Sequence, residues 1–303
     1  MRIPRKALAA AGPVALVTLL LLMPFPASWE GAWQSKCFDL GHVPLFATLT
    51  ICLWLVLGRS WLWPPVIALA LAALTELVQD WFGRNGSLLD FVRGALGVAA
   101  AMVALHAWEG SRSLTRLALH ALAIVALVAW PVADAAPWLL DAWEGWRAFP
   151  TVADFATERQ LLRWRCNEQA TLQRIPDPEQ PSGALAQLDF LPGSKPYSGV
   201  EMEPIVRDWR GQRHLCCSFT VAGEPPLIVV FSIRGYNAQE PTSNFQEEKT
   251  YAAGTHVVRI NLEAAAPRAR NGPLNLAHIR RLVVFTYAPD RPRTVVLHRV
   301  WLE

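Results

Sequence analysis

The sequence predicts two parts of different fold class: an all-α membrane bundle of about five transmembrane helices, followed by an all-β, jelly-roll-like sandwich. The first half of the 303-residue chain is largely apolar with few charges, whereas the second half is mixed and rich in Pro and Arg. Short alternating runs separated by turns fill most of that second half. We expect the helical domain at 1–135, a linker with an amphipathic helix at 136–183 and the sandwich at 184–303.

Apolar runs predict the transmembrane helices. Each run approaches the roughly 20 residues that a helix needs to cross a bilayer. The five runs cover 7–25, 40–58, 62–81, 91–108 and 117–133. Pro64 and Pro65 fit the first turn of the third helix, where a missing backbone donor matters least.

Basic residues predict the orientation of these helices. They are Arg2, Arg5 and Lys6 before the first run, Arg59 after the second, and Arg112 and Arg116 between the fourth and fifth. Because cytoplasmic connections carry an excess of Lys and Arg, we expect a cytoplasmic N-terminus and place everything after residue 133 on the opposite side. Alternatively, the first run is a secretory signal cleaved near 26–28.

Ionisable side chains gather at the end of the third run and the start of the fourth. Glu76 and Gln79 are three residues apart and share one face of the third helix. Asp90 and Arg93 have the same spacing at the start of the fourth helix, and Arg84 lies in the connecting loop. Such groups are costly at this depth, so the stretch predicts a functional site.

A third helix adds to this site. Asp39 and His42 stand at the outward start of the second run. Three helices therefore bring polar side chains to the same depth, just inside the outer surface. This convergence predicts one shared cluster.

Three interpretations of the cluster stay open. Charges in a low-dielectric setting must be paired, so Glu76 should pair with Arg84 or Arg93, and Asp90 with an arginine, which would lock the helices together. The arginines also suit a phosphate-bearing lipid head group. Glu76 and His42 are candidates for acid/base catalysis, since a buried Glu can have a raised pKa and His titrates near neutrality.

These residues carry a family resemblance. The pattern consists of His42 with Phe46, then Glu76, Gln79, Arg84, Ser87, Asp90 and Gly97. Over about residues 30–108 it resembles the VanZ-like family of small bacterial membrane proteins. The resemblance implies an inner-membrane protein acting at the cell envelope, because the family's named member is linked to low-level resistance to teicoplanin. By position it also implies that His42, Glu76, Gln79, Arg84 and Asp90 are functional.

The second half predicts one helix and then strands. Apolar positions interleaved with charges predict a helix over 152–175, and the Pro-rich segment 176–183 ends it. Alternating runs then predict strands at 186–191, 200–206, 214–221, 227–233, 256–261, 282–287 and 294–302. The last strand would tie down the C-terminal residues.

The segments 208–211, 254–262 and 297–302 resemble jelly-roll carbohydrate-binding modules and galactose-binding-like domains. The resemblance implies a carbohydrate ligand, with Trp209, Tyr236 and Tyr251 as candidates for stacking on a sugar ring. Trp209 is equally open to interpretation as a core or turn residue. The segment 237–250 is expected to be a loop outside the sheets, where ligand contacts concentrate.

Composition excludes some classes. A net charge of +3 with scattered basic residues gives no support to a nucleic-acid partner. The five Cys form no CxxC or Cys/His spacing, so we expect no metal site, and no cofactor is predicted. Cys216 and Cys217 would point to opposite faces of a strand and should not form a bridge.

Three functions follow. The first is a bacterial inner-membrane VanZ-like protein whose periplasmic sandwich binds a glycan or another envelope component, with a membrane lipid or lipid-linked glycan as partner. The second is a membrane enzyme acting on a lipid-linked or cell-wall intermediate. The third is a scaffold that binds a protein. The sequence does not decide whether the chain is an enzyme.

Overall fold

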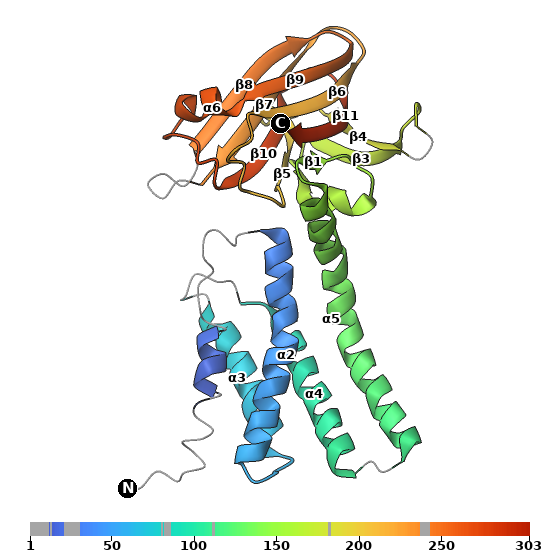
Figure 1. Ribbon diagram of the computed structural model, residues 1–303, viewed down its shortest axis with the longest axis vertical. Coiled ribbons are helices and arrows are strands. Elements are labelled where there is room, and N and C mark those ends of the chain that lie inside the picture. The colour runs from blue at the N-terminus through green and yellow to red at the C-terminus, as the bar shows by residue number, and fades with distance from the viewer. Residues whose placement is uncertain are drawn as a thin grey trace. The chain divides into compact units, whose positions relative to one another are not determined.

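The computed structural model describes residues 12, 14–20, 31–79, 81, 86–110, 113–180, 183–236 and 243–303 (Figure 1). The chain divides into two compact units, Met1–Leu139 and Leu140–Glu303. The first is helical and the second is built mainly from strands. Most of the segment expected to be a linker, 136–183, falls within the second unit.

Four helices make up most of the helical unit. They are α2 (Ala32–Val56), α3 (Trp63–Gln79), α4 (Leu88–Gly110) and α5 (Leu114–Ala148), and residues 14–20 are also helical. By length and composition α2, α4 and α5 could each cross a membrane, and α3 is a shorter apolar helix. α2 begins eight residues before the expected residue 40, because its first turns are polar and were not part of the apolar run. α5 contains Pro131 and continues past the expected residue 133 and past Pro137 to Ala148.

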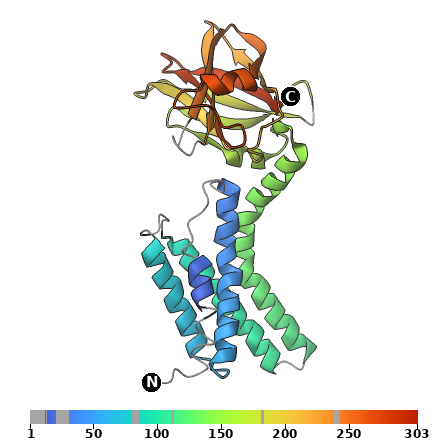
Figure 2. The ribbon, with the colours of Figure 1, turned by 60° about the vertical axis from the view of Figure 1, so that its left-hand side comes forward.

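Small residues let α2 and α4 pack closely, and the two helices lie side by side in both ribbon views (Figures 1 and 2). A Cβ atom added to Gly97 would stand 2.2 Å from the carbonyl oxygen of Val43, and one added to Gly94 would stand 2.9 Å from the Phe46 ring. Phe46 belongs to the buried core of this unit, which also contains Leu49. Glycine is therefore required where the two helices meet.

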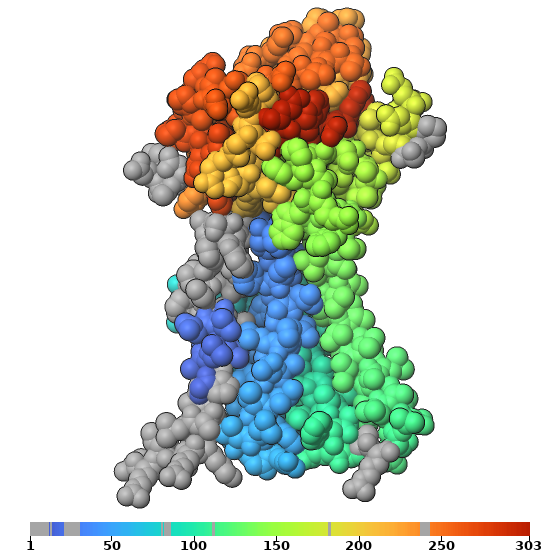
Figure 3. Space-filling model, in the orientation of Figure 1, coloured from blue at the N-terminus to red at the C-terminus, as the bar shows by residue number. Residues whose placement is uncertain are grey.

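α5 keeps a long apolar surface exposed. Figure 3 shows its side chains, in green, at the surface of the helical unit. Leu117, Leu122 and Val125 are all at least half exposed. Such a surface in water would be unfavourable over this length, whereas lipid tails would cover it without cost.

Two antiparallel sheets form the sandwich of the second unit. Their strands are β1 (Thr151–Ala153), β2 (Trp164–Cys166), β3 (Ala170–Pro176), β4 (Ala184–Phe190), β5 (Tyr197–Met202), β6 (His214–Ala222), β7 (Leu227–Gly235), β8 (Ser243–Tyr251), β9 (Gly254–Asn261), β10 (Ile279–Tyr287) and β11 (Arg293–Leu302). One sheet has the order β3-β4-β11-β6-β9, with β1 also paired to β11, and the other has the order β2-β5-β10-β7-β8.

Alternating side chains from both sheets fill the core between them. On β11, Val295, Leu297, Val300 and Leu302 are all buried. The step from 297 to 300 breaks the period of two, because the register with β6 shifts between Leu297 and Arg299. This irregularity keeps both ends of the strand facing the core. As expected, the C-terminal residues are tied down in a strand.

Two expectations for the second half are wrong. The segment 152–175 is not a helix: it contains β1, β2, most of β3 and a short 3-10 turn, Glu158–Arg163. The mixture of charged and apolar residues in this segment is compatible with either a helix or a strand. Residues 170–176 form a strand because β3 pairs with β4 along its whole length. The segment 237–250 is not wholly a loop, since β8 begins at Ser243, and 237–242 lies outside the described residues.

The close approach of α2 and α4 can be tested with Gly97→Ala. The added methyl group collides with a backbone carbonyl, so we expect a net loss of about 1–3 kcal/mol and a lower thermal midpoint for the full chain in detergent. Gly110→Ala is the matched control on the same helix, because nothing lies within 4 Å of its added Cβ. Equal midpoints for the two variants would contradict the packing argument.

Candidate functional site

His42 and Glu76 meet inside the helical unit. The His42 side chain is 3% exposed, and its Nε2 atom lies 3.9 Å from Oε1 of Glu76. The other ring nitrogen, Nδ1, is 3.0 Å from the carbonyl oxygen of Phe38. Glu76 Oε2 accepts a hydrogen bond of 2.7 Å from the backbone nitrogen of Ser87. The end of α3, the start of α2 and the segment before α4 are thereby joined.

Arg93 is the cationic centre of the same cluster. Its guanidinium donates to Asp90 at 2.5 Å and to Asp134 at 3.0 Å, and it lies 3.5 Å from Asp39. Lys36 in turn donates to Asp134 at 2.9 Å. The expected pairing of Asp90 with an arginine is therefore found. Asp39 on α2, placed here by the sequence, also faces Arg93.

Lys36 and Asp134 were missed by the sequence reasoning. Lys36 lies before the apolar run that defined the second helix, and Asp134 directly follows the run that defined the fifth. Both belong to helices that extend beyond their apolar runs. A search for charges just outside each run would have found them.

Gln79 is buried at 1% exposure with its amide oxygen and nitrogen both lacking a hydrogen-bond partner among the described residues. A buried amide without partners costs about 1–3 kcal/mol, so Gln79 stands out as a group able to meet a ligand or a water molecule. Arg84, the remaining member of the expected set, lies outside the described residues, as does Asp80.

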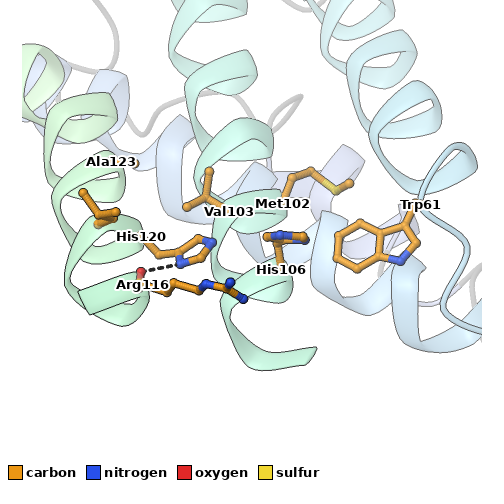
Figure 4. A pocket seen from close by; sticks show the side chains of 8 residues that line it. Trp61, Met102, Val103, His106, Arg116, His120 and Ala123 are labelled. Atoms are coloured by element: carbon orange, nitrogen blue, oxygen red, sulfur yellow. Dashed lines mark hydrogen bonds between the residues drawn. The ribbon is translucent and has the colours of Figure 1, made fainter. Parts of the chain in front are cut away.

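A second feature of the helical unit is an open pocket of about 530 Å³ between α4 and α5 (Figure 4). His106 and His120 face one another across it with ring centroids 5.4 Å apart, and Trp61 contacts His106 from the other side. His120 Nδ1 lies 2.6 Å from the carbonyl oxygen of Arg116. Most of the other side chains that line the pocket are aliphatic.

In the sandwich, two of the three expected sugar-stacking residues are buried. Trp209 is 0% exposed, and its indole donates to the carbonyl oxygen of Val206 at 2.9 Å. Tyr251 is 5% exposed and packs edge-on against Phe219, and burial raises its pKa to about 12. Neither ring offers a face to a ligand. Tyr236 is half-buried against His278 and is the only one of the three that stays a candidate.

An aromatic cluster that the sequence reasoning missed lies on the outer face of the β2-β5-β10-β7-β8 sheet. Tyr197 and Tyr287 are cross-strand neighbours and are 44% and 46% exposed. Both rings pack edge-on against Phe285, which lies two residues before Tyr287 on β10. Phe285 forms a small buried group with Val230 and Val283, separate from the core. We call the two tyrosines and these three residues the tyrosine face.

Gly199 makes room for this arrangement. A Cβ atom there would stand 2.3 Å from Cβ of Phe285, its cross-strand partner, so the aromatic side chain covers a bare stretch of β5. The sequence signal was available: Val283, Phe285 and Tyr287 alternate with the core residues of β10. An apolar residue at every position of a strand predicts that both faces of that strand are covered or used.

Polar groups are held beside the tyrosine face. Arg281 donates to both carboxylate oxygens of Glu201, at 2.8 and 3.0 Å, and Arg234 lies 3.8 Å from the same carboxylate. The Tyr287 hydroxyl donates to Glu248 at 2.6 Å, and this bond raises the pKa of the phenol. These contacts hold several hydrogen-bond donors and acceptors in fixed orientations around the tyrosine face.

The cysteines of the sandwich are not candidates for nucleophiles. Cys216 and Cys217 are buried and free, so the expected absence of a bridge between them agrees with the structure. Burial raises the pKa of the Cys216 thiol to about 11 and raises that of Cys217 further. Neither thiol ionises near neutral pH.

No protein-family model matches this chain, and no characterised sequence matches it either. The expected VanZ-like family is therefore not shown. Solved structures do match, over about half of the chain. The family 11 carbohydrate-binding module from Clostridium thermocellum, in complex with a β-1,3-1,4-mixed-linked tetrasaccharide, is 15% identical over 50% of this chain and 93% of its own, with a TM-score of 0.41.

Two further solved structures match this chain at similarly low identity and TM-score. An exo-β-agarase is 10% identical over 50% of this chain and 25% of its own, with a TM-score of 0.42. A family 30 carbohydrate-binding module of a Clostridium thermocellum cellulosomal cellulase is 13% identical over 46% of this chain and 86% of its own, with a TM-score of 0.35. Such distant similarity says nothing about a ligand, so any binding function must rest on this chain's own residues.

The role of Arg93 can be measured with Arg93→Gln. Its side chain is 5% exposed, so removing the charge leaves buried carboxylates without compensation, and we expect a loss of about 3–5 kcal/mol in stability. Arg59→Gln is the control, because Arg59 is 65% exposed and faces Glu109 at 3.6 Å. That change should cost less than about 1 kcal/mol. Thermal unfolding in detergent that showed no difference between the two would contradict the assignment.

Proposed function

We propose that this chain is a membrane-anchored glycan-binding protein, in which the helical unit spans the membrane and the sandwich binds a carbohydrate on its tyrosine face. The observation that carries the proposal is the pair of half-exposed rings, Tyr197 and Tyr287, which both pack edge-on against Phe285. Large exposed aromatic groups on a sheet have no role in the core of this unit.

The chemistry of the tyrosine face suits a sugar. The apolar faces of pyranose rings pack on aromatic side chains, while their hydroxyl groups need oriented donors and acceptors nearby. Arg281 with Glu201 on one side and Glu248 on another supply such groups, and each is already held by a neighbour. A site fixed in this way loses little side-chain entropy on binding.

The membrane part of the proposal rests on the apolar helices and the distribution of charge. Arg59 and Glu109, at the ends of α2 and α4, mark one end of the bundle, and the Arg93 cluster lies near the other. Arg59 and Arg116 both lie toward the first of these ends, and basic residues precede the first apolar run in the sequence, so the positive-inside rule favours a cytoplasmic N-terminus. The sandwich is then on the outer side, in the periplasm of a bacterial cell.

The residues that resemble the VanZ-like family support a role at the cell envelope. Within this proposal the partner is a lipid-linked or cell-wall glycan, which would be met at the outer side of an inner membrane. A contribution to glycopeptide resistance belongs to the same proposal and follows from the resemblance of His42, Glu76 and Asp90 alone.

Glycan binding is tested with Tyr197→Ala and Tyr287→Ala in the full chain. We expect the wild-type protein to bind at least one glycan on an array of β-glucan oligosaccharides and peptidoglycan fragments. Each variant should bind the same glycans with an affinity lower by about tenfold or more. Val257→Ala is the control, because Val257 is 60% exposed on β9 of the other sheet. Failure of the wild type to retain any glycan, or equal binding by all variants, would overturn the proposal.

Topology is tested separately by fusing a reporter after Glu303. Alkaline phosphatase, which matures only outside the cytoplasm, should be active in this fusion, and a fluorescent protein that needs the cytoplasm should be dark. The opposite pair of results would place the sandwich in the cytoplasm and exclude an extracellular glycan as its ligand.

A further inference from the structure

Three metal-binding side chains converge in the helical unit. One donor atom from each of His42, Glu76 and Asp90 lies within 4.8 Å of the other two. They come from α2, α3 and α4, and His42 and Asp90 are buried. No spacing rule would find this set in the sequence, because its members lie on three different helices.

The hydrogen bond of His42 fixes which nitrogen faces the acids. A carbonyl oxygen can only accept, so the contact between Nδ1 and Phe38 requires the proton of a neutral ring to be on Nδ1. Nε2 then presents a lone pair toward Glu76 Oε1, 3.9 Å away. Nε2 is buried and has no hydrogen-bond partner in the part of the chain that is described. A lone pair directed at a carboxylate is repelled by it unless a cation, a second proton or a water molecule that donates to both lies between them.

The charge of the cluster favours a cation. Its described acidic members are Asp39, Glu76, Asp90 and Asp134, and its basic members are Lys36 and Arg93. With His42 neutral, the four carboxylates and two cations of these described residues sum to a formal charge of −2. An excess of carboxylates is costly in an apolar bundle and favours the binding of a cation.

We propose that His42, Glu76 and Asp90 bind one divalent transition-metal ion, of the class of zinc or manganese. One imidazole nitrogen and two carboxylate oxygens suit such ions better than calcium or magnesium, which prefer all-oxygen sites. A divalent ion would neutralise the remaining charge of the cluster. Three protein ligands also leave at least one position open for water or a substrate oxygen.

The three donor atoms must move closer together to hold an ion. Metal–ligand bonds of about 2.1 Å place tetrahedral donor atoms roughly 3.4 Å apart, so the 3.9 Å between His42 and Glu76 must shorten by about half an ångström, and the separations to Asp90, which are at most 4.8 Å, by up to about 1.4 Å. Asp90 keeps one oxygen on Arg93 and can offer the other. The Phe38 carbonyl and Arg93 would then orient two of the ligands from outside, as such partners do in other metal sites.

The test uses the full chain in detergent, stripped with a chelator and then loaded with Co²⁺, Zn²⁺ or Mn²⁺. We expect about one ion per chain after buffer exchange, and visible absorption bands from bound Co²⁺ that a solvated ion lacks. His42→Gln and Glu76→Gln should each weaken binding about tenfold or more and remove these bands. Glycan binding by the tyrosine face is independent of the outcome.

Matched controls are His120→Gln and Glu109→Gln, which change the same residue types at the other end of the bundle and should keep the ion. Wild-type protein that binds no ion would overturn the proposal and favour a protonated His42 paired with Glu76. Equal binding by the wild type and both ligand variants would also overturn it, since the ion would then lie elsewhere. The wild-type cobalt spectrum decides even if a ligand variant fails to fold.

Discussion

The helical unit depends on compensation of buried carboxylates by Arg93. Four of its helices are apolar over most of their length, yet α2, α4 and α5 each direct an acidic side chain at this one guanidinium. A planar guanidinium with several fixed N–H donors is well suited to contact three carboxylates at once. Because a charge left alone in an apolar bundle is costly, the positions of these helices are coupled through Arg93.

Packing and polarity reinforce one another in this unit. Gly94 and Gly97 allow α4 to approach α2 closely. This close approach brings His42 on α2 near Asp90 on α4, with Glu76 beside both. A larger residue at either glycine would separate the helices and draw the polar groups apart. The small-residue stripe, which has no chemistry of its own, therefore determines whether the cluster can hold a ligand.

Much of the fold could be predicted from the sequence, because long apolar runs and clear alternation are signals within one segment. The convergence of the polar cluster was predictable for a related reason: Glu76 and Asp90 stand at helix ends, and His42 stands at the start of an apolar run. What failed depended on partners distant in the chain. Strand β3 is strand because β4 pairs with it, and Trp209 is core because the sandwich closes over it.

The tyrosine face illustrates this limit more sharply. Tyr197 and Tyr287 are ninety residues apart, and nothing around Tyr197 distinguishes it from Tyr251, which is buried. The alternation along β10 predicts that Phe285 and Tyr287 lie on the outer face, but only the register between β5 and β10 sets Tyr197 opposite Tyr287 and Gly199 opposite Phe285. A pairing register is a property of the assembled sheet, so no local pattern could have placed Tyr197 beside Tyr287.

The same long-range pairing governs how the sandwich can form. β11, the last strand, lies in the middle of its sheet between β4 and β6, and it also pairs with β1, nearly 150 residues earlier. Neither sheet neighbour can complete its hydrogen bonds until residues 293–302 are present. Loop-closure entropy must be overcome before these contacts contribute, which makes folding slow compared with local helix formation. The helices, whose hydrogen bonds are all local, can therefore form before the sandwich is able to close.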